Sequence, residues 1–224
     1  MHNEPGTSKP SLAWPLSMGL AVVAGFIRLI PHPFNMTPVG ALGLFGGARL
    51  RLWQALTLPL TVMAVTDLLI WLIQGWRPFN SVVYGCFLVN ILLGRLLSRT
   101  SSPLRIAACS LVGSVLFFMA TNFAVWVASS IDPLTLPAGT AYVEEVRGSP
   151  YAYPVIHYAR NLEGLAACYW LALAFFSPEA PPFGFFGNLV VGDLFFCGAL
   201  FGAHAWLGRR LVRPTLSSAL ASRQ

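Results

Sequence analysis

Long apolar runs separated by short polar stretches restrict the fold of this 224-residue chain more than any other feature. A helix that crosses the hydrocarbon of a bilayer needs about 20 mostly apolar residues. The chain is 56% hydrophobic and only 10% charged, and its mean hydropathy is +0.66. These values indicate a polytopic membrane protein, an all-α helical bundle without a separate soluble domain.

We expect six transmembrane helices, at residues 12–30, 39–50, 53–74, 81–97, 106–129 and 189–207. A further apolar run at 164–176 gives only about 20 Å of helix, against a hydrocarbon core of about 30 Å. We therefore predict that this run is re-entrant or half-buried. The transmembrane bundle then covers residues 12–207, with tails at 1–11 and 208–224 and one long loop at 130–161.

The distribution of charge predicts the orientation, because cytoplasmic loops carry the excess of Lys and Arg. Six crossings place these cations on one side: Lys9, Arg49, Arg51, Arg95, Arg99, Arg105, Arg209, Arg210 and Arg213. They place these residues on the other side: Asp132, Glu144, Glu145, Glu163 and Glu179, with Arg77, Arg147 and Arg160. Both termini are thus expected in the cytoplasm and the loop 130–161 outside. A seventh crossing through 164–176 would move the last arginine cluster outside.

The net charge of +6 does not indicate nucleic-acid binding, because the arginines flank apolar runs and form no basic face. The four cysteines lie in apolar runs without a CxxC pair, and the four histidines are scattered. The chain contains no HExxH and no GxSxG motif. We therefore expect no catalytic residue, no metal and no cofactor. The external loop is rich in tyrosine, glycine and proline, which favours a folded lid or binding loop.

A break in the apolar pattern at residues 28–48, RLIPHPFNMTPVGALGLFGGA, is the best candidate for a functional segment. Lipid offers no hydrogen-bond partners, so irregular backbone at membrane depth needs protein or a water-filled cavity around it. With the expected topology, most polar residues of the spans fall in the outer half. We predict that an externally open, mostly apolar pocket for a small molecule is lined by Asn35, Thr37, Asp67, Tyr84, Asn122, Trp126, Asn188 and Asp193. The alternative is that these side chains form interhelical hydrogen bonds, worth about 0.6 kcal/mol each.

Three charged residues, Arg28, Asp67 and Asp193, lie deepest in the apolar runs, where ionisable groups are rare unless paired, solvated or functional. Arg28 and Asp67 have similar depth, so they are candidates for a buried structural ion pair. Asp193 lies nearest the membrane midplane. It is the candidate carboxylate if the protein is a proton-coupled transporter.

Small residues recur at four-residue spacing along the first expected helix, at Ala13, Ser17, Ala21 and Gly25. Such a face allows another helix to approach closely. Either it packs inside the bundle or it docks a separate membrane subunit. Gly43 and Gly47 repeat the spacing in the second span.

The motifs RLIPHPFNMTPVGALGLFGGA, LFFMATNFAVW, GLAACYW and NLVVGDLFF with LFGA together resemble an uncharacterised bacterial membrane-protein family over nearly the whole chain. That family is similar to the substrate-binding S components of energy-coupling-factor (ECF) vitamin transporters. The resemblance implies a bacterial inner-membrane protein with six helices, whose loop around Asn35 helps to close the pocket. It also implies that the small-residue face docks a transmembrane coupling subunit driven by two cytoplasmic ATPases. A lysine often follows the acidic residue of biotin-type S components, whereas Leu194 stands here, so biotin is in doubt as the ligand.

The resulting expectation is a substrate-capture subunit for a small vitamin-like or heterocyclic metabolite, with membrane lipid, the substrate and the coupling subunits as partners. Two alternatives from other classes stay open. One is a structural or assembly protein without transport activity, and the other is a stand-alone proton-coupled secondary transporter.

Overall fold

The computed structural model describes residues 13–30, 33, 35–74, 80–100, 102–131, 141–144, 155–174 and 184–221. The helices are α1 (Ala13–Ile27), α2 (Val39–Arg49), α3 (Leu52–Gln74), α4 (Ser81–Leu96), α5 (Pro103–Ser129), α6 (Leu162–Ala174) and α7 (Gly184–Ala221). The strands are β1 (Ser130–Ile131), β2 (Ala141–Glu144) and β3 (Val155–Ala159). The predictions for these charged residues concern parts of the chain outside the described residues: Lys9, Arg77, Asp132, Glu145, Arg147 and Glu179.

Each of the seven apolar runs overlaps one helix, so the helical fold class is confirmed, and α7 extends beyond the expected span 189–207 at both ends. Among the described residues, three helical stretches are long and apolar enough to cross a membrane, at Leu52–Ile73, Pro103–Ser129 and Phe186–Arg210. The apolar parts of α1, α4 and α6 are shorter, and α2 has 11 residues, or about 16 Å of helix. Length and composition alone therefore support three crossings.

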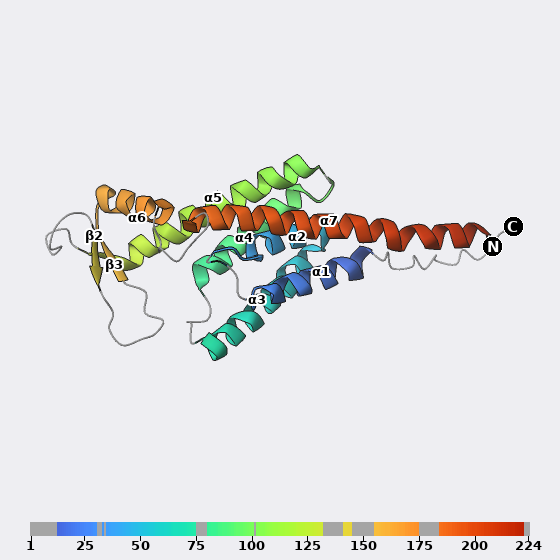
Figure 1. The fold of residues 1–224 in the computed structure, drawn as a ribbon, viewed down its shortest axis with the longest axis horizontal. Helices are drawn as coiled ribbons and strands as arrows, with labels where there is room; N and C mark the ends of the chain where they lie inside the picture. The colour runs from blue at the N-terminus through green and yellow to red at the C-terminus, as the bar shows by residue number, and fades with distance from the viewer. Residues whose placement is uncertain are drawn as a thin grey trace, which may run out of the picture.

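The helices form an elongated bundle, as Figure 1 shows, with the C-terminal end of α7 at one end and the strands and α6 at the other. Helix α2 is its centre, contacting α1, α3, α4, α5 and α7. Nine of its 11 residues are buried. A helix that is apolar on all sides belongs in the interior, and α2 follows this rule.

The backbones of helices α2 and α4 are in direct contact. A Cβ added to Gly47 would lie 2.9 Å from the carbonyl carbon of Ile91 and 3.1 Å from the Cα of Gly94. A Cβ added to Gly43 would lie 2.9 Å from the Cβ of Asn90. The glycine spacing seen in the sequence therefore serves packing inside the bundle.

Two arginines join the C-terminal ends of the same two helices. Arg49 of α2 donates hydrogen bonds to the carbonyl oxygens of Leu97 (3.4 Å) and Thr100 (3.0 Å), just after α4. Arg95 of α4 donates in return to two carbonyl oxygens at the end of α2, including that of Leu50 at 2.7 Å. Helix C-termini carry unpaired carbonyls and partial negative charge, so each cation stabilises the end of the neighbouring helix.

The segment predicted as a folded external loop contains a small sheet with strand order β1-β3-β2. Strand β1 pairs parallel to β3, and β2 pairs antiparallel to it. Trp126 of α5 donates a 3.1 Å hydrogen bond to the carbonyl oxygen of Ala159, which holds the sheet against the helix. Tyr158 of β3 is fully buried, and burial raises the pKa of its hydroxyl. These strands are a departure from the all-α expectation.

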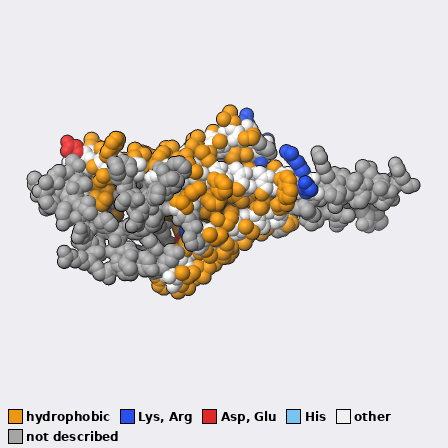
Figure 2. Space-filling model, viewed as in Figure 1, with side chains coloured by type: hydrophobic (Ala, Val, Ile, Leu, Met, Phe, Trp, Pro, Cys, Tyr) orange, Lys and Arg blue, Asp and Glu red, His pale blue; other side chains and the backbone are white. Residues whose placement is uncertain are grey.

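Large hydrophobic side chains remain exposed along the bundle, including Leu72, Ile73 and Leu92. Figure 2 shows that they cover most of the visible surface of the described helices. Lys and Arg side chains are visible toward the end with the chain termini, and acidic ones at the opposite end. Continuous apolar surface on this scale is rare in soluble monomers, and it suits contact with lipid.

Candidate functional site

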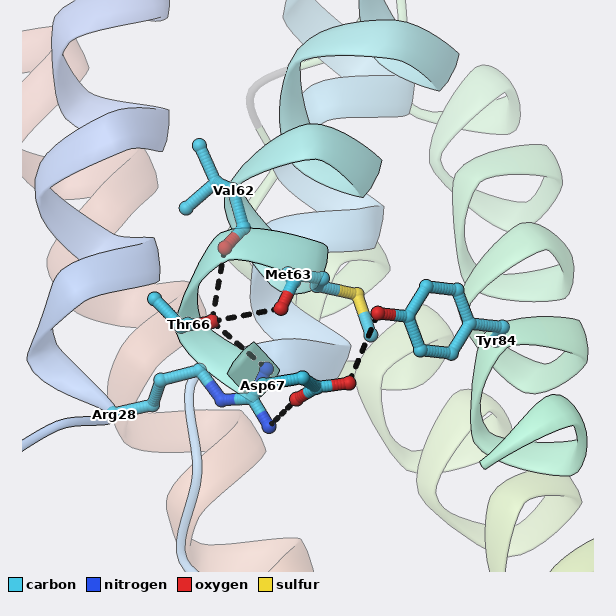
Figure 3. Close-up of polar contacts among 6 residues, drawn as sticks. All are labelled: Arg28, Val62, Met63, Thr66, Asp67 and Tyr84. Atoms are coloured by element: carbon cyan, nitrogen blue, oxygen red, sulfur yellow. Dashed lines mark hydrogen bonds and ion pairs between the residues drawn. The ribbon is translucent and has the colours of Figure 1, made fainter. Parts of the chain in front are cut away.

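A cluster of polar side chains joins the residue that follows α1 to α3 and α4, near the C-terminal end of α3 (Figure 3). Arg28 and Asp67 form an ion pair, with Arg28 Nη2 2.7 Å from Asp67 Oδ1. Tyr84 donates its hydroxyl to Asp67 Oδ2 at 2.9 Å. Arg28 Nη1 donates to Thr66 Oγ1 at 3.1 Å, and Thr66 donates to the Val62 carbonyl of its own helix. The predicted Arg28–Asp67 ion pair is confirmed.

The cluster is mostly enclosed but not sealed. The side chains of Arg28 and Asp67 are 14% and 12% exposed. Both oxygens of the carboxylate have a donor, so its charge is compensated, as a carboxylate in an apolar bundle requires. The cluster is thus one network in which a carboxylate, a phenol, a guanidinium and a hydroxyl bond to one another.

Asp193 lies in a second polar junction, between α7, α5 and the start of α2. It is 3% exposed, and Ser114 donates a 2.7 Å hydrogen bond to its Oδ2. A Cβ added to Gly40 would lie 2.8 Å from that Oδ2, so the carboxylate touches the first turn of α2. Pro38, the N-cap of α2, provides no side-chain cap. A negative charge here faces the unpaired N–H groups and the positive end of the helix dipole.

The interrupted loop after α1 packs against α7 next to this junction. A Cβ added to Gly192 would lie 3.0 Å from Cγ of Met36, which stands between Asn35 and Thr37. Asn35 has a positive φ of 64°, a left-handed conformation that asparagine tolerates better than most residues. Thr37 is partly buried. Residues 35–37 thus form a turn that lies beside α7, close to Asp193.

The remaining predicted pocket residues have local partners. Asn122 donates to the Phe118 carbonyl of its own helix at 2.8 Å, and its own carbonyl accepts from Cys168 of α6. Trp126 bonds to β3, as described above, and Asn188 is fully buried on α7. These contacts divide the eight residues into three groups: Asp67 with Tyr84, the loop with α7, and α5 with α6 and β3.

The small-residue face of α1 lies inside the bundle. Ser17 and Ala21 are buried, and Gly25 meets Val62 of α3. The side chain of Ala13 lies outside the described residues. Ser17, Ala21 and Gly25 thus pack against the chain itself, and the docking of a coupling subunit on this face stays a prediction.

Thr66 and Ser114 complete the two polar junctions but were not among the predicted site residues. A signal for Ser114 exists in the sequence, because Ser110 and Ser114 lie one turn apart in an apolar span, and both are buried. Thr66 precedes Asp67 and gives no comparable signal. Among the described residues, no group of three or more His, Cys, Asp or Glu side chains could hold a metal ion.

Comparison with known proteins places the chain in a family without assigning it an activity. No curated protein and no solved structure gave a significant match. The similarity to ECF S components therefore rests on the sequence motifs alone. A family model covers residues 8–216, nearly the whole chain, and the protein belongs to that family, DUF6580, a family of unknown function.

Proposed function

We propose that this protein is the membrane-embedded substrate-capture subunit of a transporter, similar to an ECF S component. Its substrate would be a small vitamin-like or heterocyclic metabolite, taken up with ATP-driven partner subunits. The cluster of Arg28, Asp67 and Tyr84 carries the proposal. Charged groups within apolar helices are costly, and they commonly mark a substrate or ion pathway.

The proposal includes six crossings of a bacterial inner membrane, with both termini in the cytoplasm. Helix α3 supplies a length scale, because Trp53 and Trp71 are 18 positions apart, or about 27 Å. They are 61% and 45% exposed, and tryptophan favours the two interfaces of a core about 30 Å thick. The joined ends of α2 and α4, with Arg49 and Arg95, then lie at the cytoplasmic interface.

Substrate recognition would combine an apolar surround with a few oriented polar groups, as in most small-molecule sites. The Asp67 carboxylate accepts hydrogen bonds, so a ring N–H or hydroxyl of the substrate can replace the Tyr84 hydroxyl as its donor. Tyr84 is then free to bond to the substrate itself. The exchange keeps Asp67 compensated throughout, which lowers the cost of opening the site.

The test begins with native mass spectrometry of the gently purified protein from its own host, to identify a retained metabolite and any copurified coupling subunit and ATPases. Affinity for that metabolite is then measured for Tyr84→Phe and Asp67→Asn. We expect Tyr84→Phe to weaken binding about tenfold, since the hydrogen bond between the Tyr84 hydroxyl and the substrate is lost, and Asp67→Asn to weaken it further, since the substrate loses its charged acceptor.

Matched controls are Tyr169→Phe and Glu163→Gln. Tyr169 donates to the Met119 carbonyl on the outside of α5, and Glu163 is exposed on α6. Unchanged affinity in both cluster variants would refute this site. A protein that retains only lipid and copurifies with unrelated membrane proteins would instead support an assembly role.

A second candidate function is favoured by Asp193, a buried carboxylate whose bonded partners, the Ser114 hydroxyl and the backbone N–H of Ala41, are both neutral. A carboxylate held this way is suited to binding and releasing a proton. A stand-alone proton-coupled transporter would take up substrate into liposomes in response to a pH gradient, without ATPases. Uptake lost in Asp193→Asn but retained in Asp67→Asn would select this function over the first.

A further inference from the structure

A groove of about 920 Å³ lies along α7 at the end of the bundle near the chain termini, opposite the Asp67 cluster. Its walls come from α7, from the start of α5 at Pro103 and Ile106, and from the end of α2 at Arg49. Along α7 the groove follows Gly198 and Gly202, where an added Cβ would meet nothing within 4 Å. Because these two positions are glycines, this face of α7 is open and forms the apolar part of the groove.

The end of the groove at Arg49 and Arg209 is basic. Arg49, His204 and Arg209 line it, and no acidic side chain does so among the described residues. Arg49 lies with its Cζ 5.2 Å from the ring centroid of Phe201, while its two terminal nitrogens bond to the end of α4. Its Nε is buried and has no hydrogen-bond partner in the described part of the chain. A buried N–H without an acceptor is rare, and it leaves the Arg49 guanidinium incompletely compensated within the described part of the chain.

Trp206 and Arg210 locate this end relative to a bilayer. Trp206 is 56% exposed on α7, and Arg210 lies over its ring at 5.2 Å. Exposed tryptophan beside arginine is typical of the headgroup region. The groove therefore runs from headgroup depth into the apolar zone, along the same direction as a lipid molecule in the bilayer.

We propose that this groove binds an anionic phospholipid, with the phosphate at Arg49 and Arg209 and an acyl chain along Gly198 and Gly202. The positive N-terminal end of α5 at Pro103 adds to the attraction for phosphate. Basic pockets between transmembrane helices on the cytoplasmic side are suited to acidic lipid headgroups. A helix of another protein would fit the two glycines but would leave both arginines without a counter-charge.

The experiment uses the full chain, delipidated in a neutral detergent and titrated with dioleoylphosphatidylglycerol or dioleoylphosphatidylcholine under native mass spectrometry. Inorganic phosphate is titrated separately, with the melting temperature as readout. Gly202→Leu fills the groove, and Arg209→Gln removes an exposed cation that has no acidic partner within the described part of the chain. The matched controls are Gly19→Leu, at another helix position where a Cβ meets nothing within 4 Å, and Arg105→Gln, an exposed cation at the start of α5 outside the groove.

We expect the anionic lipid to bind at least tenfold more tightly than the zwitterionic one. Gly202→Leu should reduce its affinity at least tenfold and Arg209→Gln about fivefold, while both controls stay within about twofold. Equal binding of the two lipids, or equal losses in the controls, would overturn the proposal. Stabilisation by phosphate alone equal to that by the lipid would also overturn it, because the groove would then hold a free anion. A dimer that Gly202→Leu disrupts would overturn it as well, because the groove would then hold a second helix. None of these outcomes bears on whether the Asp67 cluster binds a substrate.

Discussion

Removing one charge of the Arg28–Asp67 pair while leaving the other tests how this bundle accommodates ionisable groups. Both side chains are more than four-fifths buried, so Asp67→Asn leaves the guanidinium of Arg28 enclosed without a counter-charge. Breaking a buried pair in this way costs about 3–5 kcal/mol. We expect about 3 kcal/mol for Asp67→Asn, since an amide oxygen still accepts a bond from Tyr84, and a similar cost for Arg28→Gln. At about 2–4 °C per kcal/mol for a chain of this size, each variant should melt about 6–12 °C lower.

The double variant gives the decisive comparison, because it removes both charges together. We expect Arg28→Gln with Asp67→Asn to melt higher than either single variant, within about 6 °C of the unaltered protein. A thiol-reactive fluorophore can report unfolding, since Cys86, Cys168 and Cys197 are free and buried. Single-variant costs that simply add in the double variant would show that the two charges are not coupled, and the electrostatic reasoning would fail.

Three further substitutions test the packing of the bundle by the same melting assay. Gly47→Ala should lower the melting temperature by several degrees, because the backbones of α2 and α4 touch there. Gly85→Ala, at a position with open space, should not lower it. Equal effects of the two substitutions would contradict close packing. Arg95→Gln should cost about 1–3 kcal/mol through the carbonyls left unpaired at the end of α2, and Arg105→Gln, an exposed cation at the start of α5, should be near neutral. Ser114→Ala should cost about 1–3 kcal/mol, because a buried carboxylate loses its hydroxyl donor; no change would mean that another donor takes its place.

The positions of the helices follow from local features of the sequence. Apolar runs indicate where each helix lies, and a capping residue or a proline before the run indicates where α4 and α2 begin. Asn80 caps α4 by accepting from the N–H groups of Val82 and Val83, and α4 begins at the expected residue. Pro38 likewise precedes α2, which also begins where expected. The strands were not foreseen, because they are two to five residues long within a segment rich in glycine and proline.

Partners across the bundle were predictable only where depth alone decides them. Arg28 and Asp67 carry opposite charges at one depth, and few other groups there could compensate either. The Ser114–Asp193 bond depends on how α5 and α7 are rotated about their axes, which a continuous apolar sequence leaves undetermined. The same holds for the α7 groove, since Gly202 gives no sign in the sequence that its face is open rather than packed.

Helix α2 is short, and its length relates the Asp193 junction to the Arg28–Asp67 cluster. Its C-terminal end is held by Arg95, and its N-terminal end touches Asp193, so each end of the helix dipole meets a charge of favourable sign. Measured from the arginine end, about 16 Å of helix reaches only about half of a 30 Å core. In the proposed topology, the described residues between α1 and α2 lie in the other half, and backbone outside a helix at that depth needs polar partners within the protein. Asn35 and the Arg28–Asp67 pair lie in that half, so the proposed topology gives the break in the sequence pattern and the charged cluster one cause, a central helix that reaches only part of the way across.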